Sequence, residues 1–286
     1  MCRFLAYKGV PLLINHLLYE PKNSLIHQSY HALERRDPVN GDGFGLGWYV
    51  PDGGPEPIRY LSVRPAWNDQ NLQSIASGIR TECLFAHVRD ASAGMVTELN
   101  CHPFQYGSLL MMHNGQIEDF KNIKRHLRGV LIQEAYDWLS GETDSEHFFA
   151  LVLHHLISAG EAEYGHKALV EALQKAIKTL TSIFTECQPE KHFYLNLAIT
   201  NGKSMIACRY ETNQKTESPT LYYSSGSRFE CRDGVCQMVE SSTSEHSVLI
   251  VSEKLTDSKE DWHKVPEDSL VVVSDDLDVS VFPLNI

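Results

Sequence analysis

Short apolar runs alternate with turn residues at both ends of the chain, whereas the middle repeats its apolar positions with a helical period. The early runs predict strands over residues 2–7, 44–50, 58–63, 84–88 and 108–112. The late runs predict strands over 193–199, 204–210, 221–224, 247–252, 270–274 and 279–282. Between them we expect a short helix over 119–127 and amphipathic helices over 147–157 and 163–184. Strands, then helices, then strands favour an α+β layered fold over alternating βαβ units.

Three local signals refine this pattern. Thr143 and Glu146 have the spacing of a capping box at the start of the second helix. Asn201-Gly202 between two apolar runs predicts a β-hairpin. Alternate glycines in the segment NGDGFGLGWY predict a close backbone approach. The polar stretch 211–247 is expected to form surface loops rather than a boundary, so we expect one domain over residues 1–286.

Composition excludes several classes of protein. The 286 residues are 42% hydrophobic, and the net charge of −12 argues against nucleic acid or an anionic membrane as the main partner. The apolar runs are too short to span a bilayer, and the N-terminus does not resemble a signal peptide, so we expect a cytoplasmic protein. Seven cysteines without a CxxC motif argue against a disulfide framework or a zinc knuckle and predict mostly buried thiols.

Cys2 is the cysteine that could act as a nucleophile. Removal of Met1 would leave an α-amine with a pKa of about 7.7–8.0 on the same residue as the thiol. One residue would then supply both a nucleophile and an adjacent base. Position alone favours the simpler reading of a small buried residue that opens a strand.

Three further segments supply complementary groups. Arg89 follows an apolar strand and can grip a carboxylate with two hydrogen bonds. Asn114 and Gly115 follow another strand and can form a two-donor oxyanion hole. Asp144 precedes a helix, where a carboxylate can receive an ammonium group. Taken singly, these are a surface ion pair, a turn and a helix cap. Together they match the α-amino-acid end of a glutamine or γ-glutamyl group with its amide at Cys2.

The same segments carry a family resemblance, over nearly the whole chain. They read MCRFLAY at 1–7, DGFGLGWY at 42–49, AHVRDAS at 86–92, NCHPF at 100–104, MHNGQIEDF at 112–120, GETDSE at 141–146 and, more weakly, VSEKLT at 251–256. In these motifs the chain resembles the class II glutamine amidotransferases of the N-terminal-nucleophile (Ntn) hydrolase superfamily. The resemblance is greatest to the stand-alone branch, which includes the YafJ-like proteins, the ergothioneine-pathway γ-glutamyl hydrolase and the fungal glutathione-degrading amidotransferase subunit.

The resemblance implies a four-layer αββα sandwich and a set of residue roles. Cys2 would be the nucleophile, and Asn114 and Gly115 would form the oxyanion hole. Arg89 would bind the substrate α-carboxylate, assisted by Ser92, and Asp144 would bind the α-amine. Three further histidines are expected to be structural and hydrogen-bonded, with no metal and no cofactor: His87, His102 and His113.

The resulting expectation is a cysteine-dependent amidohydrolase that cleaves the γ-glutamyl amide bond of a small molecule through a thioester on Cys2. The motifs occupy the full length, and no synthase motif remains to consume ammonia. Either ammonia passes to a separate protein or the leaving group is an amino acid or peptide, as in glutathione, and the second is favoured. Two other classes stay open: a partner-activated subunit that serves or regulates a separate protein, and a non-catalytic binding module with the same fold.

Overall fold

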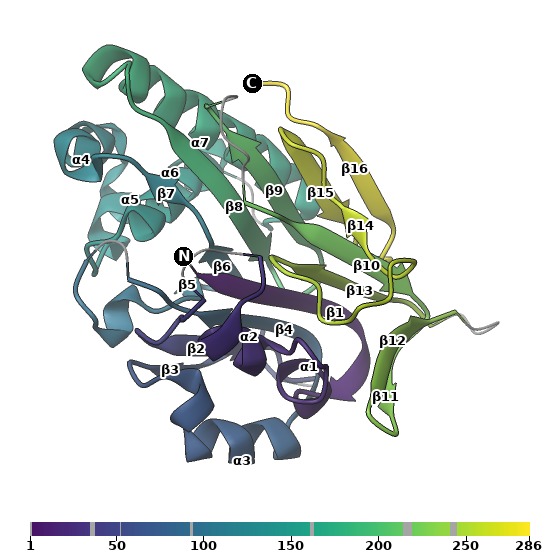
Figure 1. Ribbon diagram of the computed structural model, residues 1–286. Coiled ribbons are helices and arrows are strands. Elements are labelled where there is room, and N and C mark those ends of the chain that lie inside the picture. Colours follow the sequence, from purple (N-terminus) through teal and green to yellow (C-terminus); the bar gives the residue numbers. More distant parts are fainter. Residues whose placement is uncertain are drawn as a thin grey trace.

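Two antiparallel β-sheets lie face to face between two layers of helices in the computed structural model (Figure 1). The structure describes residues 2–34, 38–51, 53–91, 94–160, 163–213, 219–240 and 245–286. The segregated order of strands and helices thus produces the α+β layered fold expected from the sequence, and the layers are those of the αββα sandwich.

The first sheet has the N-terminal strand at its centre. Its order is β14 (His263–Lys264), β10 (Tyr222–Gly226), β13 (Ser247–Val251), β1 (Arg3–Leu13), β4 (Arg80–Val88), β2 (Phe44–Trp48) and β3 (Ile58–Ser62). Arg3 is paired with Val88, so the beginning of β1 lies beside the end of β4. This register brings Cys2 next to the segment that follows Val88.

The second sheet carries the strand that ends at Asn114. Its order is β16 (Val279–Pro283), β15 (Ser269–Val273), β9 (Met205–Glu211), β8 (Phe193–Thr200), β6 (Leu109–His113) and β5 (Phe104–Tyr106), with β7 (Gln116–Ile117) also paired to β8. Strands β8 and β9 form the predicted hairpin at Asn201-Gly202, where Gly202 has a φ of 85°.

The helices cover the two outer faces. On the first sheet lie α1 (Asn15–Leu18), α2 (Leu25–His31) and α3 (Gln70–Gly78), and on the second lie α4 (Phe120–Val130), α5 (Gln133–Trp138), α6 (Asp144–Ala159) and α7 (His166–Cys187). Side chains alternate between faces along each strand. On β1, Leu5 and Tyr7 therefore pack toward α1–α3, whereas Phe4 and Ala6 pack between the sheets.

The alternate glycines of β2 permit the close approach that the sequence predicts. A Cβ atom on Gly45 would lie 2.2 Å from the carbonyl oxygen of His102, and one on Gly47 would lie 2.6 Å from a methyl carbon of Leu110. Contacts this short are repulsive. Any larger residue would push β2 away from the segment that leads into β5.

Several elements differ from the sequence-based expectation. The short helices α1–α3 and strand β5 were not predicted, because they are too short for a hydrophobic period to be recognised. Within the stretch 211–247, β10 matches the strand predicted over 221–224, but the described part also contains a separate hairpin of β11 (Arg228–Arg232) and β12 (Val235–Val239) where loops were expected. A disulfide joins Cys231 and Cys236 across that hairpin, which corrects the expectation of free thiols there.

Among the described residues, no helix combines the length and the apolar character that a membrane span requires.

Candidate active site

Cys2 directly precedes β1, the central strand of the first sheet. By the alternation along β1, its side chain is on the same face as Phe4, between the sheets. The Cys2 thiol is 3.6 Å from the carbonyl oxygen of Asp90, and the Asp90 N–H donates to its sulfur at 3.4 Å. Burial raises the pKa of the Cys2 thiol, and the positive charges of Arg89 and Arg3 partly oppose that rise. The thiol therefore needs a base before it can attack.

Arg89 is only 3% exposed, and its backbone is held by the segment that leads into β2. Its backbone N–H donates to the carbonyl of Gly43, and its carbonyl accepts from the N–H of Asp42. Its side-chain Nη1 donates to the carbonyl of Met95 at 3.2 Å. Arg89 is therefore a buried cation beside the Cys2 thiol rather than a surface residue. Ser92, its expected assistant, lies outside the described residues.

Asn114 and Gly115 directly follow β6 in the second sheet. The Asn114 N–H donates to the carbonyl of Asn196 at 2.7 Å, and the residue is 1% exposed. A Cβ atom on Gly115 would lie 1.9 Å from His113 Nε2 and 2.3 Å from the carbonyl oxygen of Tyr194. Only glycine fits there without moving one of these groups.

His113 links this segment to the first turn of α6. Its Nδ1 is 2.8 Å from the hydroxyl of Ser145, and that hydroxyl is 3.3 Å from Asp144 Oδ1. Asp144 Oδ2 accepts from the backbone N–H of Ile117 at 2.9 Å. The Asp144 carboxylate is therefore fixed to the chain that carries Asn114 and Gly115, at the positive end of a helix dipole.

Only one of the two hydrogen bonds of the capping box before α6 forms between the described residues. The Thr143 hydroxyl accepts from the N–H of Glu146 at 3.2 Å, as the sequence predicts. The Glu146 carboxylate, however, accepts from the N–H groups of Ser140 and Gly141 instead of that of Thr143. It therefore fixes the loop that leads into Asp144 rather than the cap itself.

Asn100 joins two loops around the site. Its Nδ2 donates to the carbonyl of Met95 at 2.8 Å, and its Oδ1 accepts from the N–H of Glu142 at 3.2 Å. The carbonyl of Met95 also accepts from Arg89. Asn100 was not singled out from the sequence, although its place in NCHPF is the signal that could have identified it.

The three expected structural histidines are all buried, and two of them fit the expectation. His87 Nε2 is 3.3 Å from the carbonyl of His113, which joins the two sheets, and His113 bonds Ser145. His102 differs: neither of its ring nitrogens has a hydrogen-bond partner among the described residues. It packs against the rings of His87 and Phe104, with centroid distances of 4.2 and 4.5 Å. Burial keeps its pKa well below the usual range.

A cavity of about 640 Å³ opens beside Asp144. Its lining includes the acidic side chains of Asp119, Glu142 and Asp144 and the basic side chains of Lys121 and Lys124. Backbone and side chains of Gly94, Gln116 and Ile117 complete that wall. A cavity with both signs of charge is suited to a zwitterionic ligand such as an amino acid.

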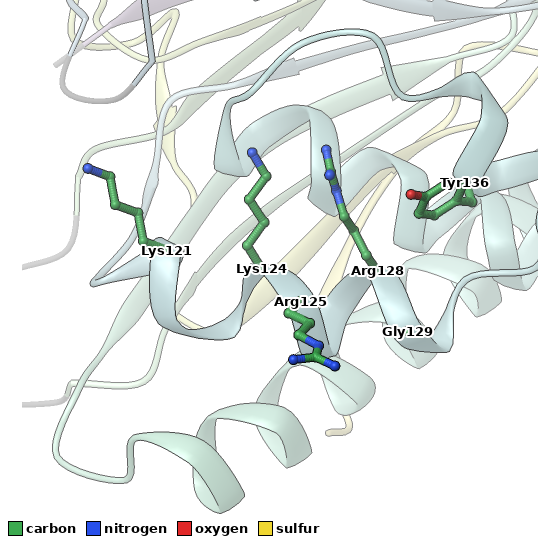
Figure 2. Close-up of a pocket in the computed structure, with 6 residues that line it drawn as sticks. All are labelled: Lys121, Lys124, Arg125, Arg128, Gly129 and Tyr136. Carbon is green, nitrogen blue, oxygen red and sulfur yellow. The ribbon is translucent and has the colours of Figure 1, made fainter.

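Lys121 and Lys124 also line a second groove, of about 480 Å³, on α4. Figure 2 shows Lys121, Lys124 and Arg128 directed to one side of the helix and Arg125 to the other, with Tyr136 beside Arg128. Across the part of the chain that the structure describes, no carboxylate lies within 4.0 Å of these four cations. The groove is a concentrated basic surface on a protein with a net charge of −12.

One cluster elsewhere has the residue types of a metal site. His16, Glu20 and Cys231 have ligand atoms within 4.8 Å of one another. Cys231 is in the disulfide with Cys236, so its sulfur is not a thiolate ligand.

Comparison with known proteins places the chain in a family. The sequence profile of the family described as "Glutamine amidotransferases class-II" matches residues 21–282. A Saccharomyces cerevisiae protein named "Probable glutamine amidotransferase DUG3" is 37% identical over 96% of this chain and 82% of its own length. The γ-glutamyl-hercynylcysteine sulfoxide hydrolase of Mycolicibacterium smegmatis is 29% identical over 72% of this chain and 78% of its own.

Solved structures agree on the fold. A glutamine aminotransferase class-II domain protein from Silicibacter pomeroyi superimposes with a TM-score of 0.66 at 23% identity, and both chains are covered completely. The glutamine phosphoribosylpyrophosphate amidotransferase of B. subtilis gives a TM-score of 0.60 at 13% identity over half of its length. The fold is therefore the αββα sandwich of the Ntn hydrolases, and the chain belongs to the class II glutamine amidotransferases, a family of amide-hydrolysing enzymes.

Proposed function

We propose that this protein is a cysteine-dependent amidohydrolase that cleaves the γ-glutamyl amide bond of glutamine or of a γ-glutamyl peptide through a thioester on Cys2. The observation that carries the proposal is the convergence, beside the start of β1, of a thiol, a buried cation and a buried carboxylate. The Cys2 sulfur contacts Asp90, which follows Arg89, and the charges of Arg89 and Asp144 both influence the pKa of that thiol. In this proposal Arg89 binds the α-carboxylate and Asp144 the α-amine of the substrate.

The chemistry follows from these roles. Removal of Met1 frees the α-amine of Cys2, which takes the thiol proton as sulfur bonds to the γ-carbonyl carbon. The oxyanion that forms is stabilised by Asn114 and the N–H of Gly115. The amine then returns the proton to the leaving nitrogen as the C–N bond breaks. Water adds to the thioester, and release of glutamate regenerates the thiol.

The leaving group is proposed to be an amino acid or peptide rather than ammonia. Support comes from the name of the M. smegmatis relative, a hydrolase of a γ-glutamyl compound whose leaving part is larger than ammonia. The test is glutamate release from glutamine, glutathione and other γ-glutamyl dipeptides, ranked by kcat/KM. A higher value for the peptides supports the proposal, and a strong preference for glutamine overturns this part of it.

A partner-activated subunit is the second candidate. The basic groove of Lys121, Lys124, Arg125 and Arg128 favours it, because a cluster of cations on an acidic protein suits an acidic partner segment. Turnover by the purified chain alone, unchanged by added cell extract, would exclude this candidate. For location, we propose the cytoplasm, on the basis of the sequence features described above.

A further inference from the structure

The backbone of the proposed nucleophile is held by a buried ion pair on the opposite face of its strand. Arg3 and Glu253 are 2% and 1% exposed, and Arg3 Nε donates to Glu253 Oε2 at 2.8 Å. Arg3 Nη1 also donates to the carbonyl oxygen of Cys2 at 2.9 Å. Since Cys2 and Arg3 point to opposite faces, this contact holds the strand end from the side away from the substrate.

Glu253 is itself fixed by several donors. Its Oε1 accepts from Asn23 Nδ2 at 3.0 Å and from the backbone N–H of Leu33 at 2.8 Å. Its Oε2 accepts from Arg3 and, at 3.4 Å, from the N–H of Glu34. The carboxylate thus connects the segments around α2 to the start of β1.

The residue before Glu253 fixes the same strand directly. The N–H of Phe4 donates to the hydroxyl of Ser252 at 2.9 Å, and the N–H of Ser252 donates to the carbonyl of Phe4 at 3.1 Å. The strand is therefore secured at Phe4, one residue beyond Arg3. The Arg3 contact lies between Phe4 and the thiol, and it restrains the Cys2 carbonyl directly.

A terminal residue needs such restraint. Once Met1 is removed, Cys2 has no preceding peptide, and chain ends fray unless they are tied down. Rotation of the Cys2–Arg3 peptide plane about the N–Cα bond of Arg3 would move the Cα atom of Cys2, and with it the thiol and the amine together, away from the substrate carbonyl. A hydrogen bond to the Cys2 carbonyl opposes that rotation.

We propose that the Arg3–Glu253 pair is a positioning device that orients the thiol and the α-amine of Cys2 by holding the Cys2 carbonyl. Buried ion pairs in general contribute little net stability to a fold, because the desolvation of the two charges offsets their attraction. In this protein the proposed role of the Arg3–Glu253 pair is to fix the orientation of Cys2. The inference rests on the proposed function, since it assigns a role relative to the Cys2 nucleophile.

The test uses three substitutions in the full chain: Arg3→Lys, Arg3→Met and Glu253→Gln. Lysine keeps the charge but, as a point donor, cannot reproduce the two-sided contact of the guanidinium. We expect kcat to fall about 10–100-fold in all three while KM changes less than about twofold, because a small misplacement of a reacting group affects the chemical step. Intact mass must show that Met1 is removed, and thermal unfolding must show a folded protein.

Arg209 supplies the matched control. It is 3% exposed, donates to the carbonyls of Pro219 and Val265, and pairs with Glu267 at 3.1 Å in the second sheet. Arg209→Met removes an equally buried guanidinium from a place where it does not touch Cys2, and its kcat should stay within about threefold of wild type. This limit follows from its separation from the reacting groups.

The rate at which iodoacetamide alkylates Cys2 distinguishes a positioning role of Arg3 from an effect of its charge on the thiol. Arg3→Lys retains the nearby positive charge, so alkylation should remain close to wild type although kcat falls. A folded, processed Glu253→Gln or Arg3→Lys protein with wild-type kcat overturns the inference, as does an equal loss in Arg209→Met. If Cys2→Ala still turns over substrate, the proposed function itself fails, which is a distinct result.

Discussion

The substitution Gly115→Ala tests the proposed oxyanion hole with a single methyl group. The new Cβ would lie 1.9 Å from His113 Nε2 and 2.3 Å from the Tyr194 carbonyl oxygen, whereas real Cβ atoms are essentially never found within 3.0 Å of such atoms. Neither neighbour gives way easily. His113 is 1% exposed and bonded to Ser145, and Tyr194 belongs to β8, where it pairs with Gln116.

The N–H of Gly115 must therefore move by roughly 1 Å from its position. A displacement of this size costs on the order of 10²-fold in rate, and complete loss of one oxyanion donor costs about 10²–10³-fold in kcat. We expect Gly115→Ala to lower kcat for glutamate release by about 100-fold or more, with KM changed much less. The assay is steady-state glutamate release, accompanied by thermal unfolding to confirm that the variant is folded.

Gly129→Ala is the matched control for this prediction. Gly129 lies in α4, and a Cβ atom there would meet nothing within 4 Å. Alanine favours a helix over glycine by about 0.5–1 kcal/mol, so this variant should keep its activity and gain stability. A folded Gly115→Ala protein with kcat within threefold of wild type would refute the assignment of its N–H as an oxyanion donor.

The other predictions concern charge. Arg89→Lys should raise KM about 10–100-fold, because the loss of a charged hydrogen bond costs roughly 1.5–3 kcal/mol; an unchanged KM for glutamate release would remove Arg89 from substrate binding. Asp144→Asn should raise KM in the same assay, and equal effects on α-amino and N-acetylated substrates would contradict its role. Burial lowers the pKa of His147 to about 4, so the unfolded chain binds its proton more readily and the free energy of unfolding should fall as pH drops from 6.5 toward 4. The fall should be about 2 kcal/mol by pH 5. Urea titrations should show a smaller fall in His147→Gln than in a control variant at exposed His126, and equal slopes would refute it.

The structure explains why His147 stays neutral. Its Nδ1 is 2.8 Å from the carbonyl of Thr143, so that nitrogen carries the proton and donates it. Arg128 Nε donates to its Nε2 at 2.9 Å, so that nitrogen must be an acceptor. A second proton would break the contact with Arg128 and place two positive charges together.

The periodicity of apolar residues and the turn residues predicted the long elements correctly, but they did not reveal the short ones. Helices α6 and α7 lie within a few residues of their predicted bounds, because their apolar faces repeat over several turns. The hairpin at Asn201-Gly202 is confirmed for the reason given by its sequence. Helices α1 and α2 have only four and seven residues, so their apolar positions show no complete period.

Part of the candidate site could likewise be predicted from the sequence, and part could not. Arg89, Asn114, Gly115 and Asp144 could be proposed from residue type and from the strand or helix that each adjoins. Their roles remain predictions. Contacts between distant segments could not be proposed, since nothing local in VSEKLT indicates that Glu253 lies 2.8 Å from Arg3. The same limit applies to His102, where the sequence suggested a hydrogen-bonded ring and the described surroundings provide packing alone.

The most direct test of the central proposal is to trap the acyl-enzyme. Wild-type protein, shown by intact mass to lack Met1, would be mixed with a γ-glutamyl substrate, quenched in acid within the first turnover and digested for peptide mass analysis. We predict a γ-glutamyl adduct on the Cys2 peptide that decays at the rate of turnover, and neither adduct nor turnover in Cys2→Ala. Glutamate release that persists in Cys2→Ala, or an adduct on another residue, would contradict it.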